Sequence, residues 1–553
     1  MANMRLTEDE RRRYDVISRE NIDFLMDRYN RVNRWVIADM VRRSCYHFPD
    51  KTALIFGDTN LTYTDLEDQC NQVANALAGL GVKKYDRVAI LARNTQHHII
   101  TLLGCAKLGA IYVAVNYLLR DDNIAFCVNH SESVVFVIED SLYLQVKDVM
   151  AKMPSVKHLI WSNQGAGQAS LACADRPPGF INFDEWFAAA PKTEPDVILR
   201  IEDPVQITYT SGTESLPKGA IINNQALISN YLSAIIDGKY EESDININAL
   251  PIFHCGQRDG GLNPLFWIGG TNVLMTPEIG KILAAIEKYR ATMFFAPPTI
   301  WIAILRHPDF GKYNLKSLVK CYSGASSMPL PILREMMEKF PHARIFNCYG
   351  QTETAPHHTI LKPKDAMKKL GSVGMATLHM ESRIEGPDGL EINAAGAAGE
   401  ICGRGPHAMT MYFKDSDKTE TTMTGGWFHS GDLGVLDDDR YITVVDRKKD
   451  MINSGGENVA SCKVEEAIYL HPAVEEVAVV GVDHPHWVEA VVAVVKLKTG
   501  FCATEDELLA HCRDHLAGFE SPKKIIFVNE LTKTPSGKIL KRMIREQYRG
   551  VFA

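Results

Sequence analysis

The sequence lacks any apolar run that approaches the roughly 18–20 residues needed to span a bilayer. Its opening residues also lack the apolar core of a secretory signal. Its 12 cysteines form no CxxC pair and no Cys/His cluster with zinc spacing, which argues against a zinc ribbon and a disulfide scaffold. We therefore expect a soluble, cytoplasmic protein with reduced cysteines and no transmembrane segment.

The charge of the chain argues against a nucleic-acid-binding protein. The net charge is −8. A duplex-binding protein usually carries a basic domain or stripe, whereas the basic run Arg11–Arg13 directly follows three acidic residues, as on a solvated helix face. We therefore expect no nucleic acid partner. Nothing in the sequence decides between a monomer and a homodimer.

Before Gly371, short apolar runs alternate with amphipathic stretches. Each run is bounded by polar or glycine-containing turns, a rhythm typical of parallel α/β layers. A chain of 553 residues is long enough for several structural units. The expected strands are Arg87–Leu91, Ile111–Val115, Val134–Ile138, His158–Trp161, Val205–Thr208, Thr271–Met275, Thr292–Ala296 and Arg344–Cys348.

After Gly371 the pattern changes to short strands with Asp-Gly and Gly-Gly turns, which predicts a small antiparallel β-barrel packed on the α/β body. The charged segment Asp446–Asp450 follows, and beyond it we expect a compact α+β unit. The predicted domains are therefore residues 1–446 and 447–553. The expected elements are strands at Glu381–Glu385, Gly399–Gly403, Asp432–Leu436, Val474–Val482, Glu489–Lys496 and Lys524–Val528, and helices at Lys463–Leu470 and Glu505–His515.

A glycine-rich loop spans Tyr209–Gly219. Amides and hydroxyls in such a turn can hold phosphate oxygens, and Lys218 adds a positive charge. The spacing is not that of a P-loop. The loop closely resembles the phosphate loop of the adenylate-forming superfamily, which includes acyl-CoA synthetases, peptide-synthetase adenylation domains and firefly-type luciferases. It departs from the family pattern at Glu214 and Ser215, which stand where the family has threonine and glycine.

The resemblance extends from about Val36 to about Arg542 and implies an α/β fold. In that fold, a large N-terminal domain contains two layered α/β subdomains and a small β-barrel subdomain, and a small α+β C-terminal domain is mobile. ATP, Mg²⁺ and coenzyme A are the implied cofactors. The resemblance assigns ATP phosphate contacts to Thr210, Ser211, Gly212, Thr213 and Lys218, and a place near the metal to Thr213.

Two further motifs resemble the family's nucleotide site. Gly324 and Ala325 lie in a turn of small residues, where a flat base can lie against the backbone. In the motif from Tyr349 to Glu353, the resemblance implies that the tyrosine stacks on adenine and the glutamate binds Mg²⁺. Thr352 would contact the α-phosphate. Mg²⁺ prefers carboxylate and phosphate oxygens, which agrees with these assignments.

The remaining motifs resemble the family's ribose contacts, its hinge and a turn of its mobile C-terminal domain. Asp432 and Arg447 correspond to the two ribose contacts, and Lys449 corresponds to the hinge. Gly455 and Gly456 correspond to the glycine turn that lines the path of the coenzyme A arm.

The resemblance also identifies the groups nearest the reacting acid. His254 ends a run, Leu250–His254, that resembles the segment carrying the family's aromatic gate, so it would border the acyl pocket. Lys538 resembles the lysine that reaches the carboxylate and the α-phosphate, where a cation stabilises charge on phosphorus. The expected catalytic residues are therefore Lys538, Thr352 and His254.

These motifs predict an ATP-dependent carboxylic acid–CoA ligase that forms an acyl-adenylate and then a thioester. Gly350 stands where acetate-specific relatives have tryptophan, so we expect an open acyl pocket that accepts acids larger than acetate. The overall resemblance to fatty acyl-CoA synthetases implies a medium- or long-chain fatty acid. Arg258 would recognise a second polar group only if it faced that pocket. An aryl or other non-fatty acid–CoA ligase, an enzyme that loads a carrier protein, and an inactive nucleotide-binding relative remain as alternatives.

Overall fold

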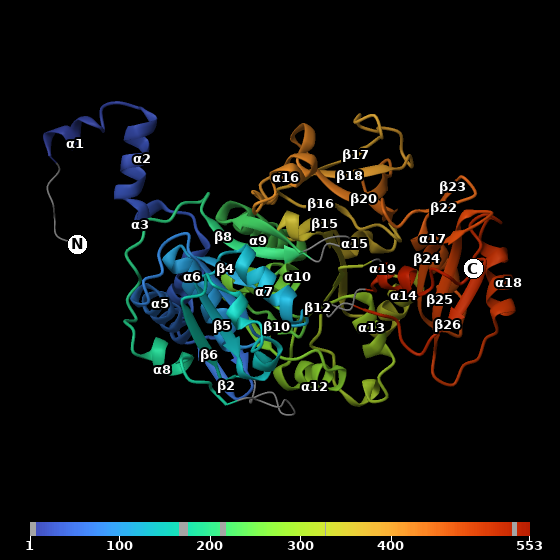
Figure 1. Ribbon diagram of the computed structural model, residues 1–553, viewed down its shortest axis with the longest axis horizontal. Helices are drawn as coiled ribbons and strands as arrows, with labels where there is room; N and C mark the ends of the chain where they lie inside the picture. The colour runs from blue at the N-terminus through green and yellow to red at the C-terminus, as the bar shows by residue number, and fades with distance from the viewer. Residues whose placement is uncertain (1–6, 165–174, 211–216, 327, 534–538, 553) are drawn as a thin grey trace.

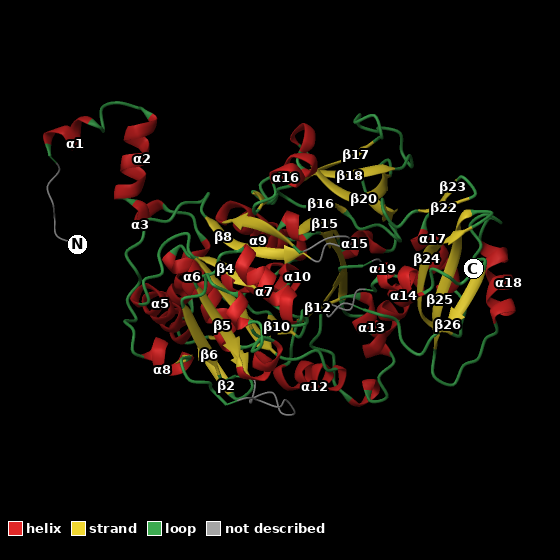
Figure 2. Ribbon diagram, viewed as in Figure 1, coloured by secondary structure: helices red, strands yellow, loops and turns green. Residues whose placement is uncertain are grey.

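The computed structural model describes residues 7–164, 175–210, 217–326, 328–533 and 539–552. Two large mixed sheets, a small antiparallel sheet and a C-terminal sheet make up the molecule, with the C-terminal sheet at one end (Figures 1 and 2). None of the described helices combines the length and apolar character that a membrane crossing needs. The predicted site residues Ser211, Gly212, Thr213 and Lys538, together with Glu214 and Ser215, lie outside the described residues.

The first large sheet holds both ends of the predicted phosphate loop. Thr210, at the end of β8, pairs with Lys218, at the start of the antiparallel strand β9. From β8 to β7 the neighbours pair in parallel, as the sequence pattern predicts. In spatial order the sheet consists of β19 (Met411–Tyr412), β9 (Lys218–Asn223), β8 (Pro204–Thr210), β4 (Ile111–Ala114), β3 (Arg87–Leu91), β5 (Val135–Glu139), β6 (His158–Ser162) and β7 (Ile181–Asn182).

The second large sheet brings several motifs to one edge. Its strands β10, β12, β13 and β14 are parallel neighbours, so their carboxyl ends lie together, the usual place for a ligand in an open α/β sheet. In spatial order the sheet consists of β16 (Met375–Ala376), β15 (His357–Leu361), β14 (Arg344–Gly350), β13 (Lys320–Gly324), β12 (Met293–Ala296), β10 (Ile245–Asn248), β11 (Thr271–Leu274), β1 (Thr52–Phe56) and β2 (Thr59–Thr62).

One hydrophobic core joins the two large sheets. Helix α6 (Gln96–Leu108) is buried along its whole length, as expected of a helix enclosed by other elements. Together with α5 (Tyr63–Gly79), it packs in a cluster that includes Ile90 of β3, Leu54 of β1 and Leu274 of β11. Because this core contains parts of both sheets, motifs carried on different sheets keep fixed positions. The other helices of this body are α1 (Glu8–Arg12), α2 (Arg19–Arg28), α3 (Asn30–Asn33), α4 (Met40–His47), α7 (Asp121–His130), α8 (Phe183–Ala188), α9 (Asn224–Gly238), α10 (Cys255–Gln257), α11 (Asn263–Ile268), α12 (Ile279–Tyr289), α13 (Pro298–Leu305), α14 (Leu330–Lys339), α15 (Pro363–Ala366) and α16 (Ser416–Thr422).

The small antiparallel sheet corresponds to the unit predicted as a barrel. Its strands pair in the order β17-β18-β20-β21, and within the described residues the two outer strands do not pair with each other. Ile442 of β21 also forms an antiparallel bridge with Gly374, so the sheet continues beyond its four named strands toward the α/β body. The strands are β17 (Glu381–Glu385), β18 (Gly399–Arg404), β20 (Phe428–Leu436) and β21 (Ile442–Arg447).

The passage to the C-terminal unit begins after β21. Arg447 is the last residue of that strand and pairs with Asp432 on β20, so the predicted boundary between residues 446 and 447 falls inside a ladder. The exposed Lys449 lies in the following turn. Asp446 Oδ2 accepts hydrogen bonds from the backbone nitrogen and the hydroxyl of Ser461, both at 2.6 Å, which bonds the last strand of the N-terminal body to the C-terminal unit.

The C-terminal unit has the predicted α+β composition. Its helix α18 (Glu505–His515) begins with a capping box in which Thr504 and Glu507 bond to each other's backbone, a common helix start. The other elements are β22 (Ile452–Ser454), β23 (Glu457–Val459), α17 (Ser461–Tyr469), β24 (Val474–His484), β25 (Val488–Leu497), β26 (Lys524–Phe527) and α19 (Lys541–Gln547).

Candidate active site

The predicted adenine and ribose residues lie in direct contact. The Tyr349 hydroxyl, at the end of β14, donates to Asp432 Oδ2 on β20 at 2.8 Å. Gln351 Nε2 donates to the same oxygen at 2.8 Å and to the Ser430 carbonyl at 2.8 Å. Burial and the neighbouring Asp432 carboxylate hold the pKa of Tyr349 well above its usual range, so the phenol stays protonated and keeps donating.

The two predicted ribose residues share one ladder. Asp432 and Arg447 are cross-strand partners, and Arg447 Nε lies 3.4 Å from Asp432 Oδ1. Because Tyr349 and Gln351 both bond Oδ2, the two carboxylate oxygens of the buried Asp432 have different partners. Oδ1 is thus the oxygen that faces Arg447, and the predicted ribose contact of this pair stays a prediction.

Glu353 connects this edge to the phosphate loop. Its Oε1 accepts a hydrogen bond from the Tyr412 hydroxyl at 2.7 Å, and its carbonyl accepts one from the Met409 amide at 2.8 Å. Tyr412 belongs to β19, which pairs with β9, the strand that begins at Lys218. The carboxylate that is predicted to hold the metal therefore lies beside the strand pair that carries the phosphate loop.

Thr352 connects the nucleotide residues to the predicted acyl gate. Its Oγ1 lies 3.3 Å from Cys255 Sγ, and Cys255 directly follows His254. The His254 ring is exposed, and its Nδ1 accepts a hydrogen bond from the Gly256 amide at 3.4 Å, which caps the short helix α10. Burial raises the pKa of the Cys255 thiol to about 12, so this sulfur is a neutral neighbour of Thr352 and not a nucleophile.

Glycines allow close backbone approaches at two predicted positions. A Cβ atom on Gly324 would lie 2.8 Å from the Cys348 carbonyl oxygen of the adjoining strand. A Cβ atom on Gly350 would lie only 1.9 Å from the Pro356 carbonyl oxygen. A residue with a side chain would therefore not fit at position 350 without a shift of the Pro356 backbone, and the place of Gly350 in the acyl pocket stays a prediction. Ala325, which follows Gly324, adopts a left-handed conformation with φ of 69°, so the predicted adenine turn is tight.

Arg258 does not face the pocket. Its side chain is 0% exposed and pairs with Asp259 Oδ2 at 2.8 Å. Its Nη1 donates to the carbonyls of Ile252 and Phe253, at 3.2 and 3.1 Å, and so holds the segment that ends in His254. It belongs to a π-helical turn, Arg258–Leu262, a distortion often found beside functional sites. Arg258 is therefore a structural residue that positions the segment ending in His254.

Replacing Arg258 with methionine is expected to lower the free energy of unfolding by about 3–5 kcal/mol, because the Asp259 charge stays buried without its guanidinium. Urea unfolding followed by tryptophan fluorescence measures the change. The matched control is Arg200→Met, since Arg200 pairs with Asp27 at a half-exposed position, and its loss should cost less than about 1 kcal/mol. Equal losses in the two variants would contradict a buried structural pair.

The C-terminal residues are arranged differently. Gly455 and Gly456 form the turn between β22 and β23, where the Gly455 amide bonds to the Trp487 carbonyl at 2.6 Å and the Gly456 amide to Asn453 Oδ1 at 3.0 Å. Both partners belong to the C-terminal unit. The role of the glycine turn therefore stays a prediction. Among the predicted site residues, those that the structure brings close together are Tyr349, Thr352, Glu353, His254, Asp432 and Arg447.

Sequence reasoning missed three contributors. Gln351 lies inside the recognised motif, but its bond to Asp432 depends on a strand from the small sheet. Cys255 and Tyr412 have no local sequence signal, because their contacts with Thr352 and Glu353 bridge 97 and 59 residues of chain. Only the fold reveals these positioning groups.

Comparisons with known proteins agree with this geometry. The family description "AMP-binding enzyme" matches residues 41–413, and "AMP-binding enzyme C-terminal domain" matches residues 463–538. A feruloyl-CoA synthase of Amycolatopsis sp is 32% identical over 505 residues, covering 90% of this chain and 96% of that protein. A long-chain-fatty-acid–CoA ligase of Bacillus subtilis is 29% identical over 542 residues, covering 92% and 94%.

A solved structure shares the whole fold. An anthranilate CoA ligase in complex with anthranoyl-AMP superposes with a TM-score of 0.87 at 26% identity, covering 94% of this chain and 98% of that one. Both the family match and these similarities extend over most of the chain. The chain therefore belongs to the AMP-binding enzyme family, within the adenylate-forming superfamily of acyl-CoA synthetases.

Proposed function

We propose that this protein activates a monocarboxylic acid with an apolar body larger than acetate, using ATP, and transfers the acyl group to coenzyme A. The observation that carries the proposal is that the segment Tyr349–Glu353 contacts Asp432 through Tyr349 and the His254 segment through Thr352 and Cys255. These contacts connect groups suited to a nucleotide with a position suited to an acid.

The burial of Arg258 supports a substrate with a single carboxylate. The sequence analysis considered this cation as a partner for a second acidic group, and its guanidinium is committed to Asp259 and to backbone carbonyls. A medium- or long-chain fatty acid is the first candidate substrate, supported by similarity to the fatty acid–CoA ligase. An aryl acid is the second candidate, supported by the higher identity to the feruloyl-CoA synthase.

In the proposed first half-reaction, a carboxylate oxygen of the acid attacks the α-phosphorus, and the bond to pyrophosphate breaks. Asp432 and Arg447 would hold the ribose, and Tyr349 and the Gly324–Ala325 turn would border the adenine. Thr352 and Lys538 would bond the α-phosphate oxygens. Positioning and electrostatic stabilisation supply most of the rate in such transfers.

Mg²⁺ fits the site through Glu353. One oxygen of this buried carboxylate is oriented by Tyr412, as a carboxylate ligand would need to be, and Mg²⁺ commonly takes one or two carboxylates with substrate phosphates. When bound, the ion would neutralise charge on the phosphates. Lys218, at the start of β9, would add a second positive charge to the same region.

In the proposed second half-reaction, the coenzyme A thiolate attacks the acyl carbonyl and AMP leaves. The C-terminal unit would rotate about Lys449, withdraw Lys538 and present Gly455 and Gly456. A hinge of this kind requires a few residues to absorb a large dihedral change, and the exposed turn that contains Lys449 is suited to it.

We expect AMP release that requires ATP, Mg²⁺, coenzyme A and one acid from a panel of butyrate, octanoate, palmitate, benzoate, a ferulate-like aryl acid and a dicarboxylate. The Lys538→Ala variant should lose on the order of 10²–10³-fold in adenylation, since it removes a cation from the transition state. Turnover with the dicarboxylate alone would contradict the single-carboxylate proposal. Nucleotide binding without turnover or pyrophosphate exchange for any acid would favour an inactive relative.

A further inference from the structure

The small antiparallel sheet carries a second group of reactive side chains. Glu385 of β17, Cys402 of β18 and His429 of β20 direct ligand atoms toward one another, all within 4.8 Å. The register explains this, since Cys402 pairs with His429 and Glu385 pairs with Glu400, the residue two before Cys402. We propose that Glu385, Cys402 and His429 bind a divalent transition-metal ion of the zinc class, with a water molecule as the fourth ligand.

The distances suit a tetrahedral ion. Bonds of about 2.0–2.3 Å at tetrahedral angles place neighbouring ligand atoms roughly 3.3–3.8 Å apart. Cys402 Sγ lies 3.5 Å from His429 Nδ1, and His429 Nδ1 lies 3.6 Å from Glu400 Oε2. Glu385 Oε1 lies 3.9 Å from His429 Nδ1, and all three ligand atoms lie within 4.8 Å of one another, so the three side chains would need to move closer together to bind one ion.

The contacts of His429 are compatible with the neutral tautomer that a metal requires. His429 Nε2 lies 3.2 Å from the Thr424 carbonyl oxygen, which can only accept, so Nε2 carries the proton. Nδ1 therefore presents its lone pair to the cluster in the neutral ring. A metal-bound histidine commonly has its other nitrogen fixed in this way by a carbonyl or a carboxylate.

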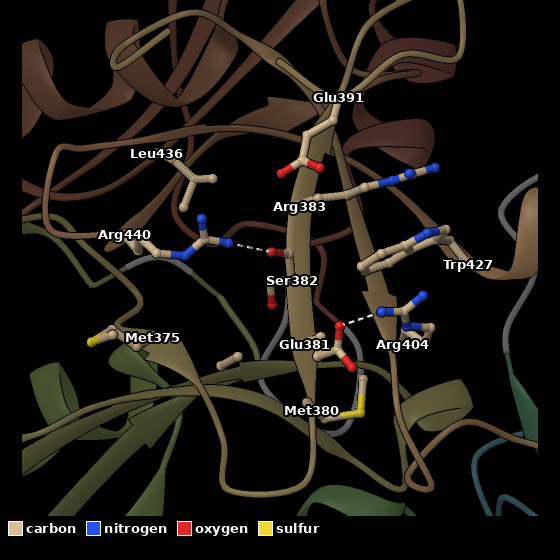
Figure 3. A pocket seen from close by; sticks show the side chains of 11 residues that line it. Met375, Met380, Glu381, Ser382, Arg383, Glu391, Arg404, Trp427, Leu436 and Arg440 are labelled. Atoms are coloured by element: carbon tan, nitrogen blue, oxygen red, sulfur yellow. Dashed lines mark hydrogen bonds and ion pairs between the residues drawn. The ribbon is translucent and has the colours of Figure 1, made fainter. Parts of the chain in front are cut away.

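Neighbouring cations partly neutralise the negative charge of the carboxylates at this cluster. Arg383 pairs with Glu385 Oε2, the oxygen that also lies 4.0 Å from Cys402 Sγ, and Oε1 lies 3.9 Å from His429 Nδ1. Lys448 Nζ lies 3.4 Å from Glu400 Oε2. Arg383 packs over the Trp427 ring at 4.4 Å, and both line a cavity of about 380 Å³ (Figure 3). On metal binding, the Cys402 thiol would release its proton to solvent as the sulfur–metal bond forms.

The mixed ligand set indicates the class of ion. Thiolate and imidazole favour zinc and similar transition metals, whereas Mg²⁺ and Ca²⁺ take oxygen ligands. The Mg²⁺ of the adenylation reaction is therefore a poor occupant of this cluster. Glu400 also accepts a hydrogen bond at 2.9 Å from the Gly431 amide, so the proposed ion would lie close to the ribose turn.

The test is a Co²⁺ titration of the full-length protein without nucleotide, because thiolate-bound Co²⁺ gives a charge-transfer absorption. We expect one equivalent to bind with this band and Zn²⁺ to displace it. Cys402→Ser should abolish the band, and His429→Asn should weaken binding at least about 10- to 100-fold. Cys502→Ser, which changes an exposed cysteine outside the cluster, is the matched control and should keep both the band and the affinity.

Thermal melting without metal checks that each variant is folded, and Zn²⁺ should raise the melting temperature of the wild type and of Cys502→Ser only. If Cys402→Ser does not fold, the His429→Asn affinity decides. No band in the wild type would mean that His429 merely bridges two carboxylates and would overturn the proposal. A band that survives in Cys402→Ser, or that disappears in Cys502→Ser, would assign the metal elsewhere and overturn it equally.

Discussion

The Glu353→Gln variant is expected to lose on the order of 10²–10³-fold in the rate of acid-dependent ATP–pyrophosphate exchange. The amide keeps the shape of the side chain and can still accept the Tyr412 hydrogen bond, so the fold should be retained. What disappears is the negative charge that would hold Mg²⁺ against the phosphates. Exchange assays across a range of Mg²⁺ concentrations measure both the rate and the metal requirement.

Two variants sharpen this experiment. Glu420→Gln changes an exposed carboxylate on α16 and should leave exchange unchanged. Tyr412→Phe removes the hydroxyl that orients Glu353 and should give a loss smaller than that of Glu353→Gln, with a higher Mg²⁺ requirement. A Glu353→Gln enzyme with near-normal exchange would remove Glu353 from the metal site.

The Asp432→Asn variant is expected to raise the KM for ATP by roughly 10- to 100-fold, because charge-assisted bonds of about 1.5–3 kcal/mol are lost. In the wild type, Oδ2 accepts from Tyr349 and Gln351, and Oδ1 faces Arg447. An asparagine has one acceptor and one donor group at these places. Its amide nitrogen must therefore face a donor, which disturbs the ribose contact in either orientation.

Initial rates of pyrophosphate exchange against ATP concentration measure this effect. The matched control is Asp439→Asn, because Asp439 is an exposed turn residue whose carboxylate pairs with Lys369. It should leave the KM for ATP near the wild-type value. The kcat of Asp432→Asn at saturating ATP should fall less than kcat/KM, since binding and not the chemical step is weakened. A fall in kcat alone would contradict a ribose contact.

Much of the α/β body could be predicted, because its strands are short apolar runs between polar turns. The expected strands at Arg87–Leu91 and Glu381–Glu385 and the helix at Glu505–His515 have the bounds that the structure gives. The barrel was less predictable, since closure depends on which strands pair and not on their individual patterns. The substrate was the least predictable feature, because the motifs belong to the nucleotide chemistry that aryl and fatty acid–CoA ligases share, and similarity extends to both.

Groups that act through long-range contacts gave no sequence signal. The cysteine spacing argued against a zinc ribbon, and that reasoning holds only for ligands that are near one another in sequence. Glu385, Cys402 and His429 are brought together by strand register instead. Tyr412 likewise reaches Glu353 only because β19 pairs with β9.

The ladder between Asp432 and Arg447 ends immediately before the turn that contains Lys449. Under the proposed mechanism, both ribose contacts thus belong to the half of the enzyme that stands still while the other half turns. The acyl-adenylate would therefore stay bound through its ribose while the C-terminal unit rotates. The fraction lost to water would then depend on how release and hydrolysis compete with the rotation, so a tight ribose contact would allow a slower hinge without wasting ATP.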